Sequence, residues 1–275
     1  TINVRATDSA SNVTALADYG TQTFIIDTTA PAVSLASIAS PSADATPTFT
    51  GTATDVSSTI SSVEYQIDSG TWIPALASDG IFNSANEAFT LTPSLLADGS
   101  HTINVRATDS ATNVTAFTDN WTQTFIIDTT VPSVNAGTDK TVNAIFTQDA
   151  TVDGAVAGVA SYQWSKVSGP GTITFGSATS EDTTVSASQD GTYTIRLTVL
   201  DNAGNTTFDE MILVWDTTKP SSAVTTSGVI GPNTWMQSID GTASDALSGI
   251  VSVNVTVTNP VGNVFDGTAF ITGGT

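Results

Sequence analysis

The chain has 275 residues, more than the roughly 100 that one β-sandwich domain needs, and its 26 acidic and six basic side chains give a net charge of −20. This balance argues against nucleic acid as a partner, because phosphates are bound by clustered Lys and Arg, and it disfavours anionic membrane surfaces. Without Cys the chain has no disulfides or thiolate metal sites, and it contains no apolar run long enough to insert into a membrane.

Short segments that alternate apolar and polar residues recur along the chain and predict β-strands. Clear examples are residues 63–67, 103–107 and 193–199, in a chain where Gly, Pro, Asn and Asp separate such runs. A period of two with one apolar face indicates sheets that cover a shared core. The sequence therefore predicts an all-β chain of tandem sandwich domains.

An internal repeat divides the chain. Residues 1–31 and 102–132 are identical at 25 of 31 positions, and a diverged third copy begins at Thr192. Each copy closes with Asp-Thr-Thr-x-Pro, and we call these segments the first joint (27–31), the second joint (128–132) and the third joint (216–220). Their aspartates are 101 and 88 residues apart, which is the size of one sandwich domain.

The joints predict four domain segments. Residues 1–28 supply the closing strands of a preceding sandwich, and residues 217–275 supply the opening part of a further one. Between them we expect two complete sandwiches, at 29–128 and 129–216. Because each end segment lacks what the other has, we expect completion by neighbouring copies of the chain or by adjacent repeats, head to tail.

Several motifs resemble known families. The segment 29–128 resembles the bacterial Ig-like repeats of large surface adhesins and filaments, through residues 51–55, 63–72, 96–102 and 128–132. Residues 221–275 begin the same pattern again with Gly-Thr-Ala-Ser-Asp at 241–245. The unit before them is similar to a polycystic-kidney-disease-type (PKD) domain, through residues 162–171 and 190–193. Both resemblances imply immunoglobulin-like sandwiches.

Catalysis finds little support in the sequence. His101 is the only histidine and lies in an Asp-Gly-Ser-His turn, so we expect a turn role rather than a general base or zinc ligand. The acidic residues recur in repeated turns instead of gathering in one singular segment. The chain is therefore not expected to be an enzyme.

Calcium at the joints is the strongest candidate for site chemistry. In an Ig-like sandwich the B–C and F–G loops lie at the pole where the chain enters the domain. For 29–128 this places Asp27 of the linker beside Asp55 of the B–C loop and Asp109 with Asn113 of the F–G loop. These oxygens suit a hard cation, although the same residues could simply form turns. The resemblance to adhesin repeats also implies calcium there.

The same reasoning extends less completely to the other joints. At the second joint it gives Asp128, Asp201 and Asn205, but Gly154–Gly158 stands where the first domain has Asp55, with only Asp153 nearby. At the third joint it gives Asp216 and Asp245. The glycine that usually precedes the F–G loop asparagine is present only as Gly204, with Ser11 and Thr112 in its place elsewhere.

Three functions fit these observations. The near-identical repeat favours a structural segment of an extracellular, cell-surface stalk, adhesin or filament, since duplication lengthens a rod while a binding site needs no copies. The alternatives are adhesin domains that bind a surface ligand, and accessory modules of a secreted polysaccharide-degrading enzyme. An adhesive tip would be expected to carry one unit with divergent, aromatic-rich loops.

Overall fold

The structure is a computed structural model that describes residues 2–15, 20–22, 24–116, 121–225, 239–258, 261, 264–265 and 270–271. Within these ranges every regular element is a β-strand, which confirms the predicted all-β fold. None of the described residues forms a helix that could cross a membrane.

The chain divides into two compact units. The first comprises Thr1–Pro132 with Gly154–Ala160 and Leu200–Thr206, and the second comprises Ser133–Asp153, Ser161–Val199 and Thr207–Thr275. The contacts of the first and second joints therefore lie inside the first unit, and those of the third joint lie inside the second.

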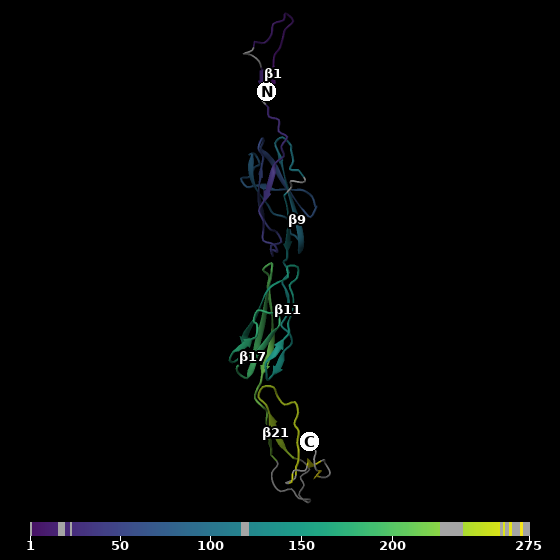
Figure 1. Ribbon diagram of the computed structural model, residues 1–275, viewed down its shortest axis with the longest axis vertical. Helices are drawn as coiled ribbons and strands as arrows, with labels where there is room; N and C mark the ends of the chain where they lie inside the picture. Colours follow the sequence, from purple (N-terminus) through teal and green to yellow (C-terminus); the bar gives the residue numbers. More distant parts are fainter. Residues whose placement is uncertain are drawn as a thin grey trace. The chain divides into compact units, whose positions relative to one another are not determined.

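The first sandwich is drawn around β9 in Figure 1 and consists of two four-stranded sheets, ordered β10-β9-β5-β6 and β3-β4-β8-β7. Its strands are β3 (Ala32–Leu35), β4 (Phe49–Thr54), β5 (Ile60–Ile67), β6 (Ile73–Pro74), β7 (Leu76–Ala77), β8 (Asn86–Leu91), β9 (Gly99–Asp109) and β10 (Trp121–Ile127).

Alternation along these strands fills the core of the first sandwich. In β9 the buried positions are every second residue from Ile103 to Asp109, so one face of the strand points inward. Phe49 and Phe125 meet edge to face with ring centroids 5.2 Å apart, and both are almost fully buried. Each such aromatic residue contributes roughly 1.5–3 kcal/mol by leaving water.

The second sandwich is drawn around β11 and β17 in Figure 1 and contains the sheets β12-β19-β18-β15, β13-β17-β16 and β11-β14. Its strands are β11 (Ser133–Asn135), β12 (Lys140–Val142), β13 (Phe146–Gln148), β14 (Thr151–Asp153), β15 (Val159–Ser168), β16 (Ile173–Phe175), β17 (Thr183–Ala187), β18 (Gly191–Asp201) and β19 (Thr206–Trp215). Trp164 is buried at its centre, and its indole N–H donates to the carbonyls of Ser180 and Glu181.

In their described residues, the two end segments contain short paired strands. Near the N-terminus β1 (Ile2–Val4) pairs antiparallel with β2 (Gly20–Gln22). Near the C-terminus β20 (Ser221–Val224) pairs with β21 (Gly241–Ser244), and β22 (Val264–Phe265) pairs with β23 (Phe270–Ile271). Their described apolar side chains remain largely exposed, in contrast to those of the two sandwiches.

Candidate metal centre

The strand pairing of the first sandwich brings three acidic segments to one pole. Strand β4 ends directly before Asp55, and β9 ends at Asp109. Because Ile60 at the start of β5 pairs with Asp109, the β4–β5 loop and the loop after β9 lie at the same end. The first joint reaches this pole as well, since Thr115 donates a hydrogen bond of 3.1 Å to the carbonyl of Pro31.

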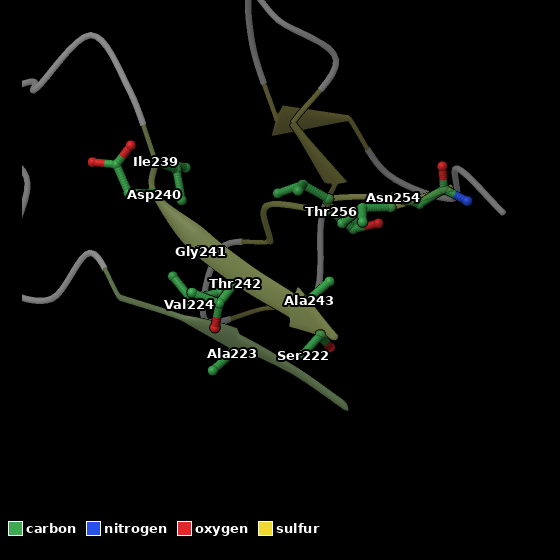
Figure 2. Close-up of a pocket in the computed structure, with 12 residues that line it drawn as sticks. Ser222, Ala223, Val224, Ile239, Asp240, Gly241, Thr242, Ala243, Asn254 and Thr256 are labelled. Atoms are coloured by element: carbon green, nitrogen blue, oxygen red, sulfur yellow. The ribbon is translucent and has the colours of Figure 1, made fainter. Parts of the chain in front are cut away.

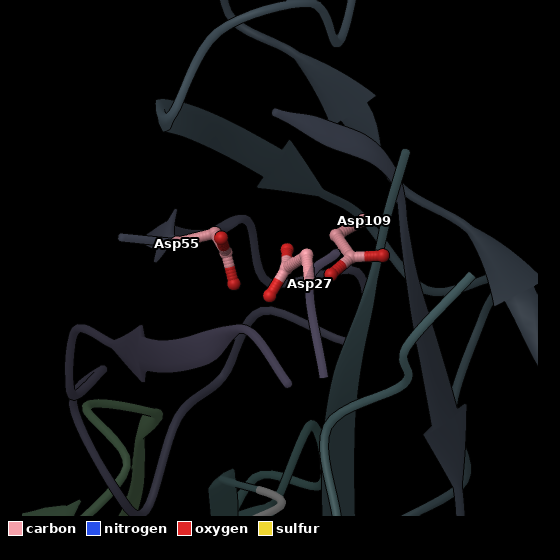
Figure 3. A group of neighbouring side chains, drawn as sticks. All are labelled: Asp27, Asp55 and Asp109. Atoms are coloured by element: carbon pink, nitrogen blue, oxygen red, sulfur yellow. The ribbon is translucent and has the colours of Figure 1, made fainter. Parts of the chain in front are cut away.

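Three carboxylates converge there, as predicted. Asp27, Asp55 and Asp109 each offer an oxygen atom, and these atoms all lie within 4.8 Å of one another. Figure 3 shows the three side chains turned toward a common point from three separate segments. Asp55 and Asp109 are buried and Asp27 is half-buried, so the group lies below the surface of the loops.

Two of these carboxylates each have one oxygen without a hydrogen-bond donor in the part of the chain that the structure describes. Oδ1 of Asp55 accepts from the backbone amides of Ser57 and Ser58, at 2.8 and 2.7 Å, and from the Ser58 hydroxyl. Oδ1 of Asp27 accepts from the amide of Thr29 at 3.0 Å. Their Oδ2 atoms are buried and have no hydrogen-bond partner among the described residues. A buried, unpartnered carboxylate oxygen is costly unless a cation binds it.

Asn113 holds the third carboxylate in place. Its side-chain amide donates to Oδ2 of Asp109 at 2.8 Å and to the carbonyl of Asp27 at 3.2 Å. Burial acts to raise the pKa of Asp109, but hydrogen bonds from Asn113, Ser58 and Ala111 together outweigh it and keep the pKa below its usual value. The amide nitrogen of Asn113 is thus used to tie the loop to the joint, which leaves only its oxygen to face an ion.

The loop that holds this asparagine adopts the same backbone turn with and without glycine. The residue before the asparagine has a positive φ in all three copies, 69° at Ser11, 71° at Thr112 and 98° at Gly204. The repeated hydrogen bonds of the loop hold Ser and Thr in this left-handed region, where only glycine is free of strain. Ser or Thr in place of this glycine therefore leaves the backbone conformation of the loop unchanged.

Among the described residues, no basic side chain forms an ion pair at the acidic pole. The ion pairs of the described residues join Asp68 to His101, Glu64 to Arg106, and Glu210 to Arg196, so none involves the three aspartates. At an effective dielectric constant of 20, two unit charges 4.8 Å apart repel each other by about 3 kcal/mol. The fold thus concentrates negative charge that a divalent cation would neutralise.

The residues predicted for the other joints are also brought together. Asn205 donates from its side chain to the carbonyl of Asp128 and to Oδ2 of Asp201, each at 2.8 Å. At the third joint, Asp216 and Asp245 both accept from the amide of Ser248, at 3.1 and 2.8 Å. Neither joint gathers three acidic side chains among the described residues.

Sequence reasoning missed the contacts of the joint threonines. Asp98, in the turn before β9, accepts from the amide and hydroxyl of Thr129 and, at 2.6 Å, from the hydroxyl of Thr130. These bonds, with that from the Thr130 hydroxyl the strongest, lower the pKa of Asp98. Asp190 binds the two threonines of the third joint in the same way. The sequence did carry a signal for these contacts, since an Asp-Gly pair stands before the closing strands that lead to the second joint and to the third joint.

Each of the two sandwiches matches a known family model. Residues 41–129 match the family model of a bacterial Ig-like domain, and residues 136–214 match that of a PKD domain. These matches confirm both resemblances for the two complete sandwiches. A search of curated proteins gives no match.

Among solved structures, the chain is similar to the PKD domain from KIAA 1837 protein, with 28% identity over 30% of this chain and 83% of that one, at a TM-score of 0.26. It is also similar to the tetra-tandem repeat in the extending region of a large adhesion protein, with 21% identity over 86% of this chain and 61% of that one, at a TM-score of 0.26. The D00–D0 domain of Intimin matches with 12% identity over 68% of this chain and 99% of that one, at a TM-score of 0.36.

Proposed function

We propose that this chain, with its bacterial Ig-like and PKD domains, is a non-catalytic structural segment of an extracellular cell-surface stalk, adhesin or filament, stiffened by calcium. The near-identical copies at 1–31 and 102–132 favour a repeated, load-carrying role. The observation that carries the calcium part is the pair of buried, unpartnered oxygens on Asp27 and Asp55. They belong to the joint and to the sandwich that follows it, so an ion between them would fasten one to the other.

The chemistry of the donor set favours Ca²⁺ over other metals. The three aspartates supply only hard oxygen ligands, and the chain has no Cys and a single His, which lies elsewhere. Calcium takes six to eight oxygens at flexible geometry, and carbonyls and water would complete the shell here. Zinc and copper prefer nitrogen or sulfur ligands, which this pole does not offer.

Thermal unfolding of the 275-residue chain with EDTA and with added Ca²⁺ tests this proposal. For an extracellular site with a Kd of roughly 0.1–1 mM, about 10 mM Ca²⁺ stabilises the folded state by about 1.4–2.7 kcal/mol. That corresponds to roughly 10 °C in the melting temperature of a domain of this size. Asp79→Asn, which removes one acidic charge from an exposed turn, is the matched control and should keep the full response. Equal melting temperatures in EDTA and Ca²⁺ would refute the calcium part.

Each end segment exposes apolar residues whose counterparts are buried in the first sandwich, and completion by adjacent repeats or by neighbouring copies of the chain, head to tail, would cover them. Ile2 and Val4 are 54% and 64% exposed, whereas Ile103 and Val105, their counterparts in the duplicated segment, are 0% exposed. Among the described residues, β1 thus exposes the face that β9 buries in the first sandwich.

The other end presents the complementary face. Ile250 and Val253 are 38% and 59% exposed, while the corresponding Ile60 and Val63 of the complete sandwich are 0% and 1% exposed. Between β20–β21 and residues 253–256 lies an open cavity of about 400 Å³, shown in Figure 2. In a complete sandwich the closing strands fill this space, so we interpret the cavity as an uncovered core instead of a small-molecule site.

Sedimentation of the full chain tests the assembly. The variants Val4→Asp and Val253→Asp each place a charge on one of the two faces, so neither variant alone should associate. Mixed together they should form dimers, because each retains the face that the other has lost. Leu76→Asp, at an exposed position of β7 outside both faces, should associate like the parent chain. Association of either face variant by itself would contradict head-to-tail completion.

A further inference from the structure

The joint aspartates differ in how their carboxylates are satisfied. At the first joint Asp27 has one partnered oxygen, bound by the Thr29 amide, and one buried oxygen without a partner. At the second joint Asp128 is completely buried. Its Oδ1 accepts from the amide of Thr130 at 3.1 Å and its Oδ2 accepts from the amide of Ala157 at 2.6 Å. The oxygen that lacks a partner at the first joint therefore has a donor at the second.

The donor comes from the loop that replaces Asp55. The amide of Gly158 donates to the carbonyl of Gly154 at 3.0 Å, and Gly158 has a φ of 71°, so the loop closes tightly. A Cβ on Gly154 would lie 2.5 Å from the Gly158 carbonyl carbon and from the Val159 nitrogen, which makes glycine necessary there. Asn202 donates from its side chain to the carbonyl of Ala157 at 2.9 Å. This loop is built to hold one amide against Asp128.

The second acidic side chain at this joint is also fully satisfied. Oδ1 of Asp201 accepts from the amides of Ala203 and Asn205, at 2.9 and 2.8 Å. Its Oδ2 accepts from the side chain of Asn205 at 2.8 Å. All four carboxylate oxygens of Asp128 and Asp201 thus have N–H donors, whereas Oδ2 of Asp27 and Oδ2 of Asp55 have none among the described residues.

We propose that the Ala157 amide takes the place of a cation at the second joint, so that the chain combines a calcium-dependent first joint with a calcium-independent second one. The first half of this statement rests on the proposed function, while the second half stands without it. It replaces the sequence-based expectation that Asp128, Asp201 and Asn205 bind calcium. Withdrawal of calcium then loosens the chain selectively at Asp27 and leaves Asp128 fastened.

Amide hydrogen exchange of the full chain, in EDTA and in excess Ca²⁺, reads each joint separately. The amides of Ala157 and Thr130 should be equally protected in both buffers, because their acceptor is the Asp128 carboxylate. The amides of Thr29, Ser57 and Ser58 should exchange about tenfold more slowly with Ca²⁺, since a bound ion holds their acceptors in place. Calcium-dependent protection of Ala157 would overturn the inference.

Two variants separate the joints further. Gly154→Ala should distort the loop and speed exchange of the Ala157 amide by about tenfold or more, equally in EDTA and in Ca²⁺, with the calcium titration unchanged. Asp27→Asn should abolish the calcium response and leave Ala157 protected. If Asp128→Asn binds one calcium ion fewer than the parent chain, the inference is wrong while the proposed function survives. If the parent chain shows no calcium response and Ala157 is protected in EDTA, the calcium part of the proposed function is wrong, but the contact between the Ala157 amide and Asp128 at the second joint is supported.

Discussion

Replacing Asp55 by Asn should change the stability of the first sandwich in opposite directions without and with Ca²⁺. The amide keeps an oxygen at the position that accepts from Ser57 and Ser58, so the loop itself is preserved. It removes one negative charge and puts an N–H₂ group where the unpartnered Oδ2 lies, within reach of the other two aspartates. The substitution therefore separates the electrostatic role of Asp55 from its role in the turn.

The size of the effect follows from the spacing of the carboxylates. In EDTA the variant loses two of three repulsive pairs, each worth about 3 kcal/mol at the 4.8 Å limit. Relaxation and counterions reduce this gain, and we expect about 1 kcal/mol of net stabilisation, or roughly 4–8 °C. In about 10 mM Ca²⁺ the variant should lose most of the 1.4–2.7 kcal/mol that the proposed ion would give the parent chain, so we expect the order of melting temperatures to reverse.

Differential scanning calorimetry in both buffers measures this reversal, and Asp55→Ala serves as the second variant. Alanine also removes the acceptor of the Ser57 and Ser58 amides, so it should destabilise the sandwich in Ca²⁺ and gain less than asparagine in EDTA. If Asp55→Asn lowers the melting temperature equally in both buffers, the three carboxylates do not repel one another as described and the reasoning fails.

Two further predictions concern the same sandwich. Although burial lowers the pKa of His101, its contacts with the Ala97 carbonyl and the Asp68 carboxylate raise it overall, so the charged form stabilises the fold. This stabilisation is complete below the unfolded pKa of about 6.5 and is lost as pH rises through the folded value. In denaturant unfolding, we expect the free energy of unfolding to fall by about 0.5–1 kcal/mol as the pH rises through the folded pKa of His101, and this fall should be absent in His101→Gln. If stability depends on pH equally in both proteins, the His101–Asp68 pair does not stabilise the fold. Thr112→Gly should raise stability by about 1 kcal/mol, because a β-branched residue is strained at a φ of 71°. The reverse change at the equivalent turn of the second sandwich, Gly204→Thr, should lower stability in the same assay. A neutral result for both variants would show that the turn carries no strain.

Much of the fold follows from the sequence because its signals are local. The alternation in residues 103–107 and 193–199 specifies which face of β9 and β18 is buried, and one apolar face requires a second sheet to cover it. The pole at which Asp27, Asp55 and Asp109 meet follows from antiparallel strands, which return alternate loops to the same end. Residue types and topology were sufficient for these statements.

The contacts that distinguish the joints depend on backbone groups, which residue types do not reveal. The sequence shows that Gly154–Gly158 lacks a carboxylate, but not that the amide of Ala157 is placed against Asp128. It likewise shows Asp98 as a turn residue, but not its bonds to Thr129 and Thr130. Every residue except proline carries an amide donor, so only the closed geometry of the loop selects the one that binds.

The Asp-Thr-Thr-x-Pro sequence of the joints is compatible with two different groups opposite its aspartate. At the second joint the two threonines bind Asp98 of the preceding sandwich, and the aspartate faces the loop that follows β14. The threonines of the third joint bind Asp190 in the same way, so this half of the motif is constant. What varies is the loop opposite the aspartate, which supplies the Asp55 carboxylate in one case and the Ala157 amide in the other. If calcium binds the first joint as proposed, a change in that loop alone would convert a calcium-dependent joint into a calcium-independent one, because a buried carboxylate oxygen without a donor favours a cation and an amide supplies that donor.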